Sequence, residues 1–397
     1  MTPADRAGIW VFRRLARTGT LEVEMPSRDR MIIGRGAPTA DIAIRDRGAI
    51  LEIFREGLTG FAGSYIDGRI ETSDLGRLVA WGLANQEVWF EHPLVVATSP
   101  IRRFWQRIRP ERRHPRVRSM NEHYNLGNDF YAKWLDPTMT YSSARFQHPD
   151  QTLEQGQRHK YRTIADHAGL APGFRVLEIG CGWGGFAEVA AAELGCEVVG
   201  ITLSEEQASF AEKRVANAGL ADKVEIRIED FRETVGEFDA VVSIEMIESI
   251  DERQWPELFQ TIFDRLCAGG RAAMQIITIA DSEWERYRRR PDFIQQYIFP
   301  GGQLPAPKVL RRLSAAVGLE IEQVETFGPD YARTLALWRR EFDDAWEHLR
   351  AQNQLDERFR RMWGLYLTLC EAGFRMGRIN VEQWVFSKPV PGSAGSR

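Results

Sequence analysis

A glycine-rich loop is the first place in this sequence where residue types and spacing could do chemistry. It runs from Glu178 to Gly185 as EIGCGWGG, between a short apolar run and an alanine-rich one. Glycines between a strand and a helix let the backbone approach a cofactor closely and aim helix N–H groups at it. Gly180, Gly182 and Gly185 match the G-x-G-x-x-G dinucleotide pattern, which alone is a weak signal. A tight turn without a ligand is the alternative.

The residues around the loop indicate which nucleotide it holds. An NAD(P)-dependent oxidoreductase would carry an acid at the end of the second strand, but residues 200–204 read GITLS. Glu178 precedes the loop, as in the class I methyltransferases that bind S-adenosylmethionine, and could anchor the cationic end of that cofactor. Further polar and aromatic candidates follow the next strands, with Thr202, Ser204 and Gln207 for the ribose, Asp230 for the adenine amine and Phe231 for its face.

Alternating strands and helices must position these side chains. Apolar runs predict strands at residues 175–179, 197–201, 224–228, 240–244 and 272–277, and helices at 186–194 and 207–218. This spacing predicts an α/β fold with a Rossmann-like, mostly parallel, doubly wound sheet covered on both faces.

The rest of the chain suggests further domains. Residues 1–98 predict a small α+β domain, with strands at 21–25 and 42–44 and a helix at 75–83 capped by Asp74. A basic linker at 99–118, a catalytic domain at 119–388 and a disordered polar tail at 389–397 follow. The four cysteines are scattered, so neither a disulfide framework nor a metal site is indicated.

The composition predicts a folded, soluble protein, with 43% hydrophobic and 27% charged residues. No stretch approaches the roughly 20 apolar residues of a membrane span, and residues 1–6 have no signal-peptide character. We therefore expect a cytoplasmic protein. Between Ile101 and Arg118 lie eight arginines and one glutamate. This run predicts either a solvated linker or a surface that binds phosphate groups of a membrane or nucleic acid.

Eight ordered segments resemble one family. From about residue 121 to 388 the sequence is similar to the cyclopropane-fatty-acyl-phospholipid synthases, which include the mycolic acid cyclopropane synthases. The resembling segments are residues 123–130 (HYNLGNDF), 135–144 (LDPTMTYSSA), 178–185, 200–204, 243–248 (SIEMIE), 297–302 (YIFPGG), 331–335 (YARTL) and 370–375 (CEAGFR). The N-terminal region resembles, more loosely, the accessory domain of longer bacterial members.

The resemblance implies a reaction in which a cis double bond of a phospholipid acyl chain attacks the methyl group of S-adenosylmethionine. A carbocation results, and loss of a proton from the new methyl closes a cyclopropane ring. Aromatic faces and a base are needed. The resemblance assigns the cofactor to Tyr141, Ser142, Glu178, Gly180, Cys181, Gly182, Trp183, Gly184, Thr202, Leu203, Ser204, Gln207, Asp230 and Phe231.

The resemblance also implies catalytic residues. Glu248 and Tyr331 match positions that hold bicarbonate, which is thought to be the base. Ser143 and Gln275 belong to the same bicarbonate site, where well-known members carry a cysteine and a histidine. Cys370 matches a cysteine traditionally marked as an active-site residue, with a buried core cysteine as the alternative. The base site is therefore altered, although Glu248 and Tyr331 remain.

These departures leave several functions open. We expect cyclopropane formation first, and methyl- or methylene-branched acyl chains (or furan precursors), completed by a separate redox partner, as the alternative. A small-molecule methyltransferase and a binding protein without catalysis are further alternatives. With a lipid substrate, we favour the basic segment as a face that docks on the anionic inner surface of the membrane, rather than on nucleic acid. Family members often form homodimers, and the resemblance extends this to the present chain.

Overall fold

The computed structural model describes residues 12–13, 16–85, 126–289 and 292–391. The predicted basic linker at 99–118, residues 123–125 of the first resembling segment and residues 392–397 of the tail lie outside these ranges. The chain divides into two compact units. The first draws on residues 1–125, 291–300 and 346–372, and the second on residues 126–290, 301–345 and 373–397. Each unit is described by itself.

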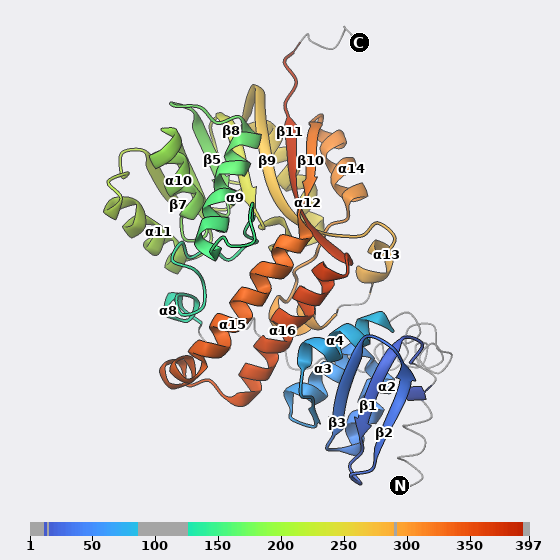
Figure 1. The fold of residues 1–397 in the computed structure, drawn as a ribbon. Coiled ribbons are helices and arrows are strands. Elements are labelled where there is room, and N and C mark those ends of the chain that lie inside the picture. Colours follow the sequence, from blue (N-terminus) through green and yellow to red (C-terminus); the bar gives the residue numbers. More distant parts are fainter. Residues whose placement is uncertain (1–11, 14–15, 86–125, 290–291, 392–397) are drawn as a thin grey trace, which may run out of the picture. The chain divides into compact units, whose positions relative to one another are not determined.

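The first unit contains a four-stranded sheet in the order β2-β1-β3-β4 (Figure 1). Its elements are β1 (Gly19–Glu24), β2 (Arg30–Arg35), β3 (Thr39–Ile44), α2 (Arg47–Glu56), α3 (Leu58–Ile66), β4 (Ile70–Glu71) and α4 (Leu75–Ala84). Leu21 and Ile42 of the sheet share a core with Trp81 of α4. The two predicted strands are confirmed as β1 and β3, and the predicted helix as α4. Asp74 caps α4 as predicted, by accepting a hydrogen bond from the Arg77 amide at 3.0 Å.

The second unit is built on a seven-stranded sheet in the order β10-β11-β9-β8-β5-β6-β7 (Figure 1). The strands are β5 (Arg175–Ile179), β6 (Glu197–Thr202), β7 (Val224–Ile228), β8 (Phe238–Ile244), β9 (Leu266–Ile279), β10 (Glu320–Thr326) and β11 (Ile379–Ser387). The neighbouring pairs β7–β6, β6–β5, β5–β8 and β8–β9 are parallel, whereas β11 is antiparallel to β9 and to β10. The predicted α/β fold with a mostly parallel sheet is confirmed.

Helices cover both faces of this sheet because successive strand residues point to opposite sides. Val176 of β5 packs in one core cluster with α9 (Leu153–Ala168) and α10 (Gly185–Leu194). The next residue, Leu177, packs in another with α12 (Trp255–Arg265) and α14 (Pro307–Val317). The other helical elements described are α8 (Asn128–Tyr131), α11 (Glu205–Asn217), η2 (Ile247–Ser249), η3 (Glu252–Gln254), α13 (Trp284–Tyr287), η4 (Ile294–Ile298), α15 (Gly328–Asn353) and α16 (Glu357–Arg375).

The carboxyl ends of the parallel strands position the candidate site, as is usual for open α/β sheets. The glycine loop follows β5, Thr202 ends β6, and Glu245 directly follows β8. On β9, Gln275 pairs with Ile244, so Gln275 lies beside the end of β8. None of the helices in the described part of the chain has the length and apolar character that a membrane span needs.

Candidate functional site

The glycine loop joins β5 to α10 with a backbone that few other residues could adopt. Gly180 has a φ of 82°, and a Cβ atom there would lie 2.7 Å from Cγ of Met246. Gly182 has a φ of 53°, and no heavy atom lies within 4 Å of the point where its Cβ would be. The loop therefore presents uncovered backbone at Gly182, as close approach by a cofactor requires.

Glu178 lies in β5 immediately before the loop. Its side chain is buried, and its Oε2 atom has no hydrogen-bond partner among the described residues. Burial raises the pKa of this carboxyl to about 8, against the opposing effects of Lys160 and the Ala187 amide. A buried acceptor without a donor is costly, so a ligand that donates hydrogen bonds would stabilise it. The loop and this acceptor fit S-adenosylmethionine.

The polar candidates after β6 form a connected group. Thr202 Oγ1 donates to Gln207 Oε1 at 3.0 Å and accepts from the Ser204 amide at 3.2 Å. Ser204 caps α11 by accepting from the Gln207 amide at 3.3 Å. Leu203 is 71% exposed. These residues present a fixed set of neutral polar atoms beside an exposed apolar side chain at the end of β6.

Asp230 and Phe231 follow β7, as predicted for the adenine end of the cofactor. The Asp230 carboxylate accepts two hydrogen bonds from the Arg232 guanidinium, at 2.9 and 2.7 Å. These bonds lower the pKa of Asp230. Phe231 is buried in the core cluster that contains α12. Asp230 is therefore held ionised, and the Phe231 ring is fixed by packing.

Ser142 is clamped by two residues of α9. Gln157 Nε2 donates to the Ser142 carbonyl at 2.8 Å, and Lys160 Nζ donates to Ser142 Oγ at 2.6 Å. Both α9 side chains are fully buried. Burial lowers the pKa of Lys160 to about 7, although Glu245, Asp136 and Glu178 act in the opposite direction. This clamp fixes the backbone that leads directly into Ser143.

Three donors converge on the carboxylate of Glu245. Oε1 accepts from the Ser143 amide and from Gln275 Nε2, each at 2.8 Å, and Oε2 accepts from Tyr331 Oη at 2.6 Å. Glu245 has a φ of 51°, which is uncommon for a residue with a side chain. Burial raises the pKa of Glu245, although these hydrogen bonds and Lys160 lower it. The site is an anion-binding arrangement filled by the chain's own carboxylate.

Glu248 lies three residues further on, in η2, and makes different contacts. Its Oε1 atom accepts from the Ile277 amide, while its Oε2 atom has no hydrogen-bond partner among the described residues. Burial and the negative charge of Glu245 raise the pKa of Glu248 to about 8. At neutral pH Glu248 is therefore mainly a neutral acid beside an ionisable neighbour.

The other predicted catalytic residues lie in different surroundings. Ser143 contributes its backbone N–H to Glu245, while its hydroxyl donates to the Ala144 carbonyl at 2.8 Å. Cys370 lies on α16 in the first unit, where burial and Asp292 raise the pKa of its thiol. The structure brings three of the predicted catalytic residues together around Glu245, namely Ser143, Gln275 and Tyr331. Glu248 and Cys370 make other contacts.

An aromatic cluster runs between the glycine loop and Tyr331. The ring centroids of Trp183 and Tyr131 are 5.2 Å apart, and those of Tyr131 and Tyr141 are 5.5 Å apart. Trp338 lies 5.3 Å from Tyr141 and 6.1 Å from Tyr331, again between centroids. These five rings, which we call the aromatic cluster, offer π-faces that can stabilise positive charge.

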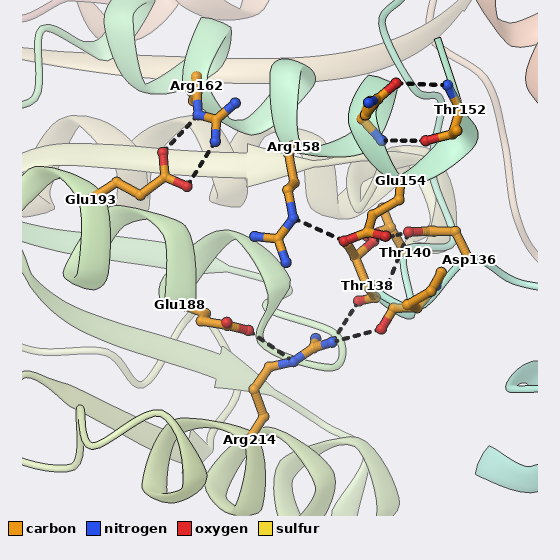
Figure 2. Close-up of polar contacts among 12 residues, drawn as sticks. Asp136, Thr138, Thr140, Thr152, Glu154, Arg158, Arg162, Glu188, Glu193 and Arg214 are labelled. Atoms are coloured by element: carbon orange, nitrogen blue, oxygen red, sulfur yellow. Dashed lines mark hydrogen bonds and ion pairs between the residues drawn. The ribbon is translucent and has the colours of Figure 1, made fainter.

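Arg214 of α11 ties the glycine loop to the segment before Tyr141, and Figure 2 shows its contacts with Glu188 and Thr138. It donates to the Trp183 carbonyl and to the Thr138 carbonyl, each at 2.8 Å. Its Nε atom lies 3.1 Å from a carboxylate oxygen of Glu188, on α10. One guanidinium therefore holds the loop, α10 and the 137–138 turn together.

The residues that the sequence alone did not single out are Glu245, Lys160, Gln157 and Arg214. Glu245 was visible only as part of the resembling segment 243–248, and a buried Lys on α9 carries no local signal. Among the described residues, no group of three or more His, Cys, Asp and Glu side chains could hold a metal ion.

The doubly wound sheet, the glycine loop and Glu178 together define a class I S-adenosylmethionine-dependent methyltransferase. Comparisons with known proteins agree. The profile of the mycolic acid cyclopropane synthetase family matches residues 111–384. The chain belongs to this family, whose S-adenosylmethionine-dependent enzymes modify lipids.

Two curated relatives and one solved structure illustrate the similarity. The tuberculostearic acid methyltransferase UfaA1 of Mycobacterium tuberculosis is 38% identical over 393 residues, covering 96% of this chain and 91% of that protein. The cyclopropane-fatty-acyl-phospholipid synthase of Escherichia coli is 33% identical over 372 residues, covering 92% of each. The crystal structure of mycolic acid cyclopropane synthase CmaA1 with SAH and CTAB gives a TM-score of 0.63 at 32% identity, covering 68% of this chain and 96% of that one.

Proposed function

We propose that this protein is a fatty-acyl C-methyltransferase. It methylates a cis double bond in an unsaturated phospholipid acyl chain and leaves a methylene-bearing chain, for which Glu245 is the base. The observation that carries the proposal is the Glu245 carboxylate, which takes the hydrogen bonds of the Ser143 amide, Gln275 Nε2 and Tyr331 Oη. A carboxylate in hydrogen-bonding reach of the reacting chain can act as a general base.

The same donors lie at three positions that the family resemblance assigns to a bicarbonate site. With all three directed at Glu245, they are not available to a second anion. We therefore assign the role of base to a side chain of the protein, and no step requires bicarbonate. This difference in the base is the reason to separate this chain from ring-forming members of the family.

The aromatic cluster supports the charge that the reaction creates. S-adenosylmethionine, when bound, supplies an electrophilic methyl group. The alkene π electrons form the new C–C bond, the S–C bonding pair leaves with the thioether, and the acyl chain becomes a carbocation. The faces of Tyr141 and Tyr331 can stabilise such a cation, and Tyr331 Oη donates to Glu245, so the proposed base lies beside one of these rings.

Loss of one proton completes the balance. A hydride shift from the methylated carbon to its neighbour moves the cation, and Glu245 then takes a proton from the new methyl group to give a methylene. Saturation of the methylene to a methyl branch needs a hydride donor, which a separate redox partner would supply. Two relatives support this product class by name: UfaA1 and a probable fatty acid methyltransferase of Pseudomonas putida, 37% identical over 287 residues.

Cyclopropane formation is the second candidate. It is favoured by Glu248, whose Oε2 atom has no hydrogen-bond partner among the described residues and, in the ionised form of this carboxyl, could serve as another proton acceptor. The 92% mutual coverage with the Escherichia coli cyclopropane synthase also favours it. In this outcome the proton leaves the new methyl group without a hydride shift, and the ring closes.

Product analysis distinguishes the two candidates. The protein is incubated with vesicles of a monounsaturated phospholipid and cofactor carrying a CD₃ group, and the released fatty acids are analysed by mass spectrometry and NMR. We expect a CD₂ methylene group, which mild hydrogenation converts to a branched methyl. A CD₂ cyclopropane that resists hydrogenation would overturn the proposal in favour of the second candidate.

A further inference from the structure

Two glutamines on neighbouring strands form a hydrogen-bond chain that leads to Glu245. Gln275 of β9 and Gln383 of β11 are register partners, and both are fully buried. Gln383 Nε2 donates to Gln275 Oε1 at 3.0 Å. Gln275 Nε2 in turn donates to Glu245 Oε1 at 2.8 Å and to the Ser143 carbonyl at 3.3 Å. The two amides thus form a chain that ends on the proposed base.

The far end of this chain is a cation. Arg145 Nη1 donates to Gln383 Oε1 at 3.3 Å. Arg145 is itself held by an ion pair with Glu325 of β10 and lies over the Phe327 ring, 5.3 Å from its centroid. The guanidinium is therefore anchored from two sides and is 16% exposed.

The direction of every bond in the chain follows from chemistry. An arginine side chain can only donate, so Gln383 must turn its oxygen to Arg145 and its NH₂ group to Gln275. Gln275 must then turn its oxygen to Gln383, which leaves its NH₂ group for Glu245. A neutral amide could otherwise present either end to Glu245, and the oxygen would repel the carboxylate.

We propose that Gln383 and Arg145 are positioning residues that fix the orientation of the Gln275 amide and thereby keep Glu245 in its ionised form. This inference rests on the proposed role of Glu245 as the base. The other titratable groups that act on Glu245 are Tyr331 of α15, Lys160 of α9 and Glu248 of η2. Because they come from other elements, a change at Gln383 leaves them in place. At the outer end of the chain, His167 of α9 hydrogen-bonds Gln383, and Glu325 of β10 pairs with Arg145.

Gln383→Glu is the most direct test. A carboxylate at 383 has no NH₂ group to offer, so Gln275 should turn its own NH₂ group to residue 383 and its oxygen to Glu245. Burial already raises the pKa of Glu245, and loss of the Gln275 hydrogen bond raises it further. We expect the acidic limb of the pH profile of kcat/KM to move up by about one unit, so that kcat/KM at a pH on that limb falls roughly tenfold. Gln260→Glu, on the exposed face of α12, is the matched control.

Further variants separate positioning from a structural role. Arg145→Met should move the acidic limb in the same direction, and Arg145→Lys, which still donates, should restore it. In a Gln275→Leu background, Gln383→Leu, which introduces no charge, should have no further effect on the pH profile. These variants also keep the test available if the buried Gln383→Glu substitution prevents folding.

The outcomes for this inference and for the proposed function are distinct. If Glu245→Gln abolishes turnover while Gln383→Glu and Arg145→Met keep the wild-type acidic limb, the positioning role is wrong and the base assignment stands. If Glu245→Gln retains turnover, the base assignment itself is wrong. An effect of Gln383→Leu on the pH profile that persists in the Gln275→Leu background would also overturn the positioning role.

Discussion

Glu245 and Glu248 lie three positions apart and have different partners. Glu245 accepts hydrogen bonds from the Ser143 amide, Gln275 and Tyr331. Glu248 accepts from one backbone amide and has its pKa raised to about 8 by burial and by Glu245. Two interacting carboxyls whose surroundings differ in this way are suited to different protonation states at one pH. Glu245, whose carboxylate is stabilised by three hydrogen-bond donors, is the better candidate for the base.

Replacement of each acid tests this division. Glu245→Gln should lower turnover by roughly 100-fold or more, the usual range for removal of a general base. Glu248→Gln should cause a smaller loss at pH 7, because the amide resembles the neutral acid. Product formation is measured by mass spectrometry, and calorimetric titration with S-adenosylhomocysteine should show that both variants still bind the cofactor. A larger loss for Glu248→Gln would exchange the two roles.

The lowered pKa of Lys160 predicts how the stability of the folded protein depends on pH. Burial lowers its pKa from 10.5 to about 7, so between these values the unfolded chain holds a proton that the folded protein has released. This group therefore adds stability as pH rises through that window and removes it as pH falls towards 7. The Tm of Lys160→Met relative to wild type should accordingly decrease from pH 7 to pH 10.

The exposed Lys213 of α11 provides the control for this measurement. Lys213→Met should give a Tm difference without that slope when both variants are followed by circular dichroism across the same pH range. A flat Tm difference for Lys160→Met would mean that the ammonium group is not destabilised by burial.

At the scale of elements, Arg214 joins the glycine loop to its surroundings, whereas Arg162 of α9 makes a surface ion pair with Glu193 of α10 (Figure 2). Arg214 Nε also lies beside Glu188, and its side chain is 12% exposed against 49% for Arg162. Surface ion pairs contribute about 0–1 kcal/mol. The interior contacts of Arg214 to two carbonyls should matter more.

Removal of each arginine tests whether the contacts of Arg214 shape the cofactor site. Arg214→Met should weaken binding of S-adenosylhomocysteine about tenfold, because two carbonyls lose a charged donor and the loop loosens. Arg162→Met is the matched control and should change the Kd less than twofold. Calorimetric titration measures both. Equal Kd values for the two variants would show that the contacts of Arg214 do not shape the cofactor site.

How far the sequence predicted these elements depends on local signals. The strands β5 to β9 were predicted, because each contains a run of apolar residues or, in β7, an alternation of apolar and charged residues, and most are followed by a helix. Strand β11 was not, because its buried positions include Glu382 and Gln383, whose polar partners are Trp384 and the distant Gln275. Nor did the sequence predict the role of Glu245. Its donors come from three separate segments, and its positive φ has no sequence signature.

At the scale of the whole molecule, charge is unevenly distributed. The net charge is −4, yet residues 101–118 carry eight arginines and one glutamate. With the proposed phospholipid substrate, attraction to an anionic bilayer surface would be useful, at roughly 1 kcal/mol per Arg near the membrane. Membrane docking by this segment stays a prediction from the sequence, as does homodimer formation.

Vesicle binding tests the docking prediction. Replacing Arg102, Arg103 and Arg107 with Gln should weaken binding to anionic phospholipid vesicles in a sedimentation assay, and high salt should mimic the loss. The control variant replaces Arg30, Arg77 and Arg253, whose side chains are 82%, 71% and 85% exposed, and makes the same change in charge. Equal binding by the two triple variants would exclude a specific role for the basic segment.

The most direct test of the central claim asks whether the protein carries its own base. Glycine accepts the positive φ of residue 245 without strain, so Glu245→Gly removes the carboxylate and leaves the donors of Ser143, Gln275 and Tyr331 free for a bound anion. Turnover is measured in buffer stripped of carbon dioxide and again with added bicarbonate. We predict that the wild type is active in both, whereas Glu245→Gly is inactive until bicarbonate is added. Wild-type turnover that requires bicarbonate, or full activity of Glu245→Gly without it, would show that Glu245 is not the base.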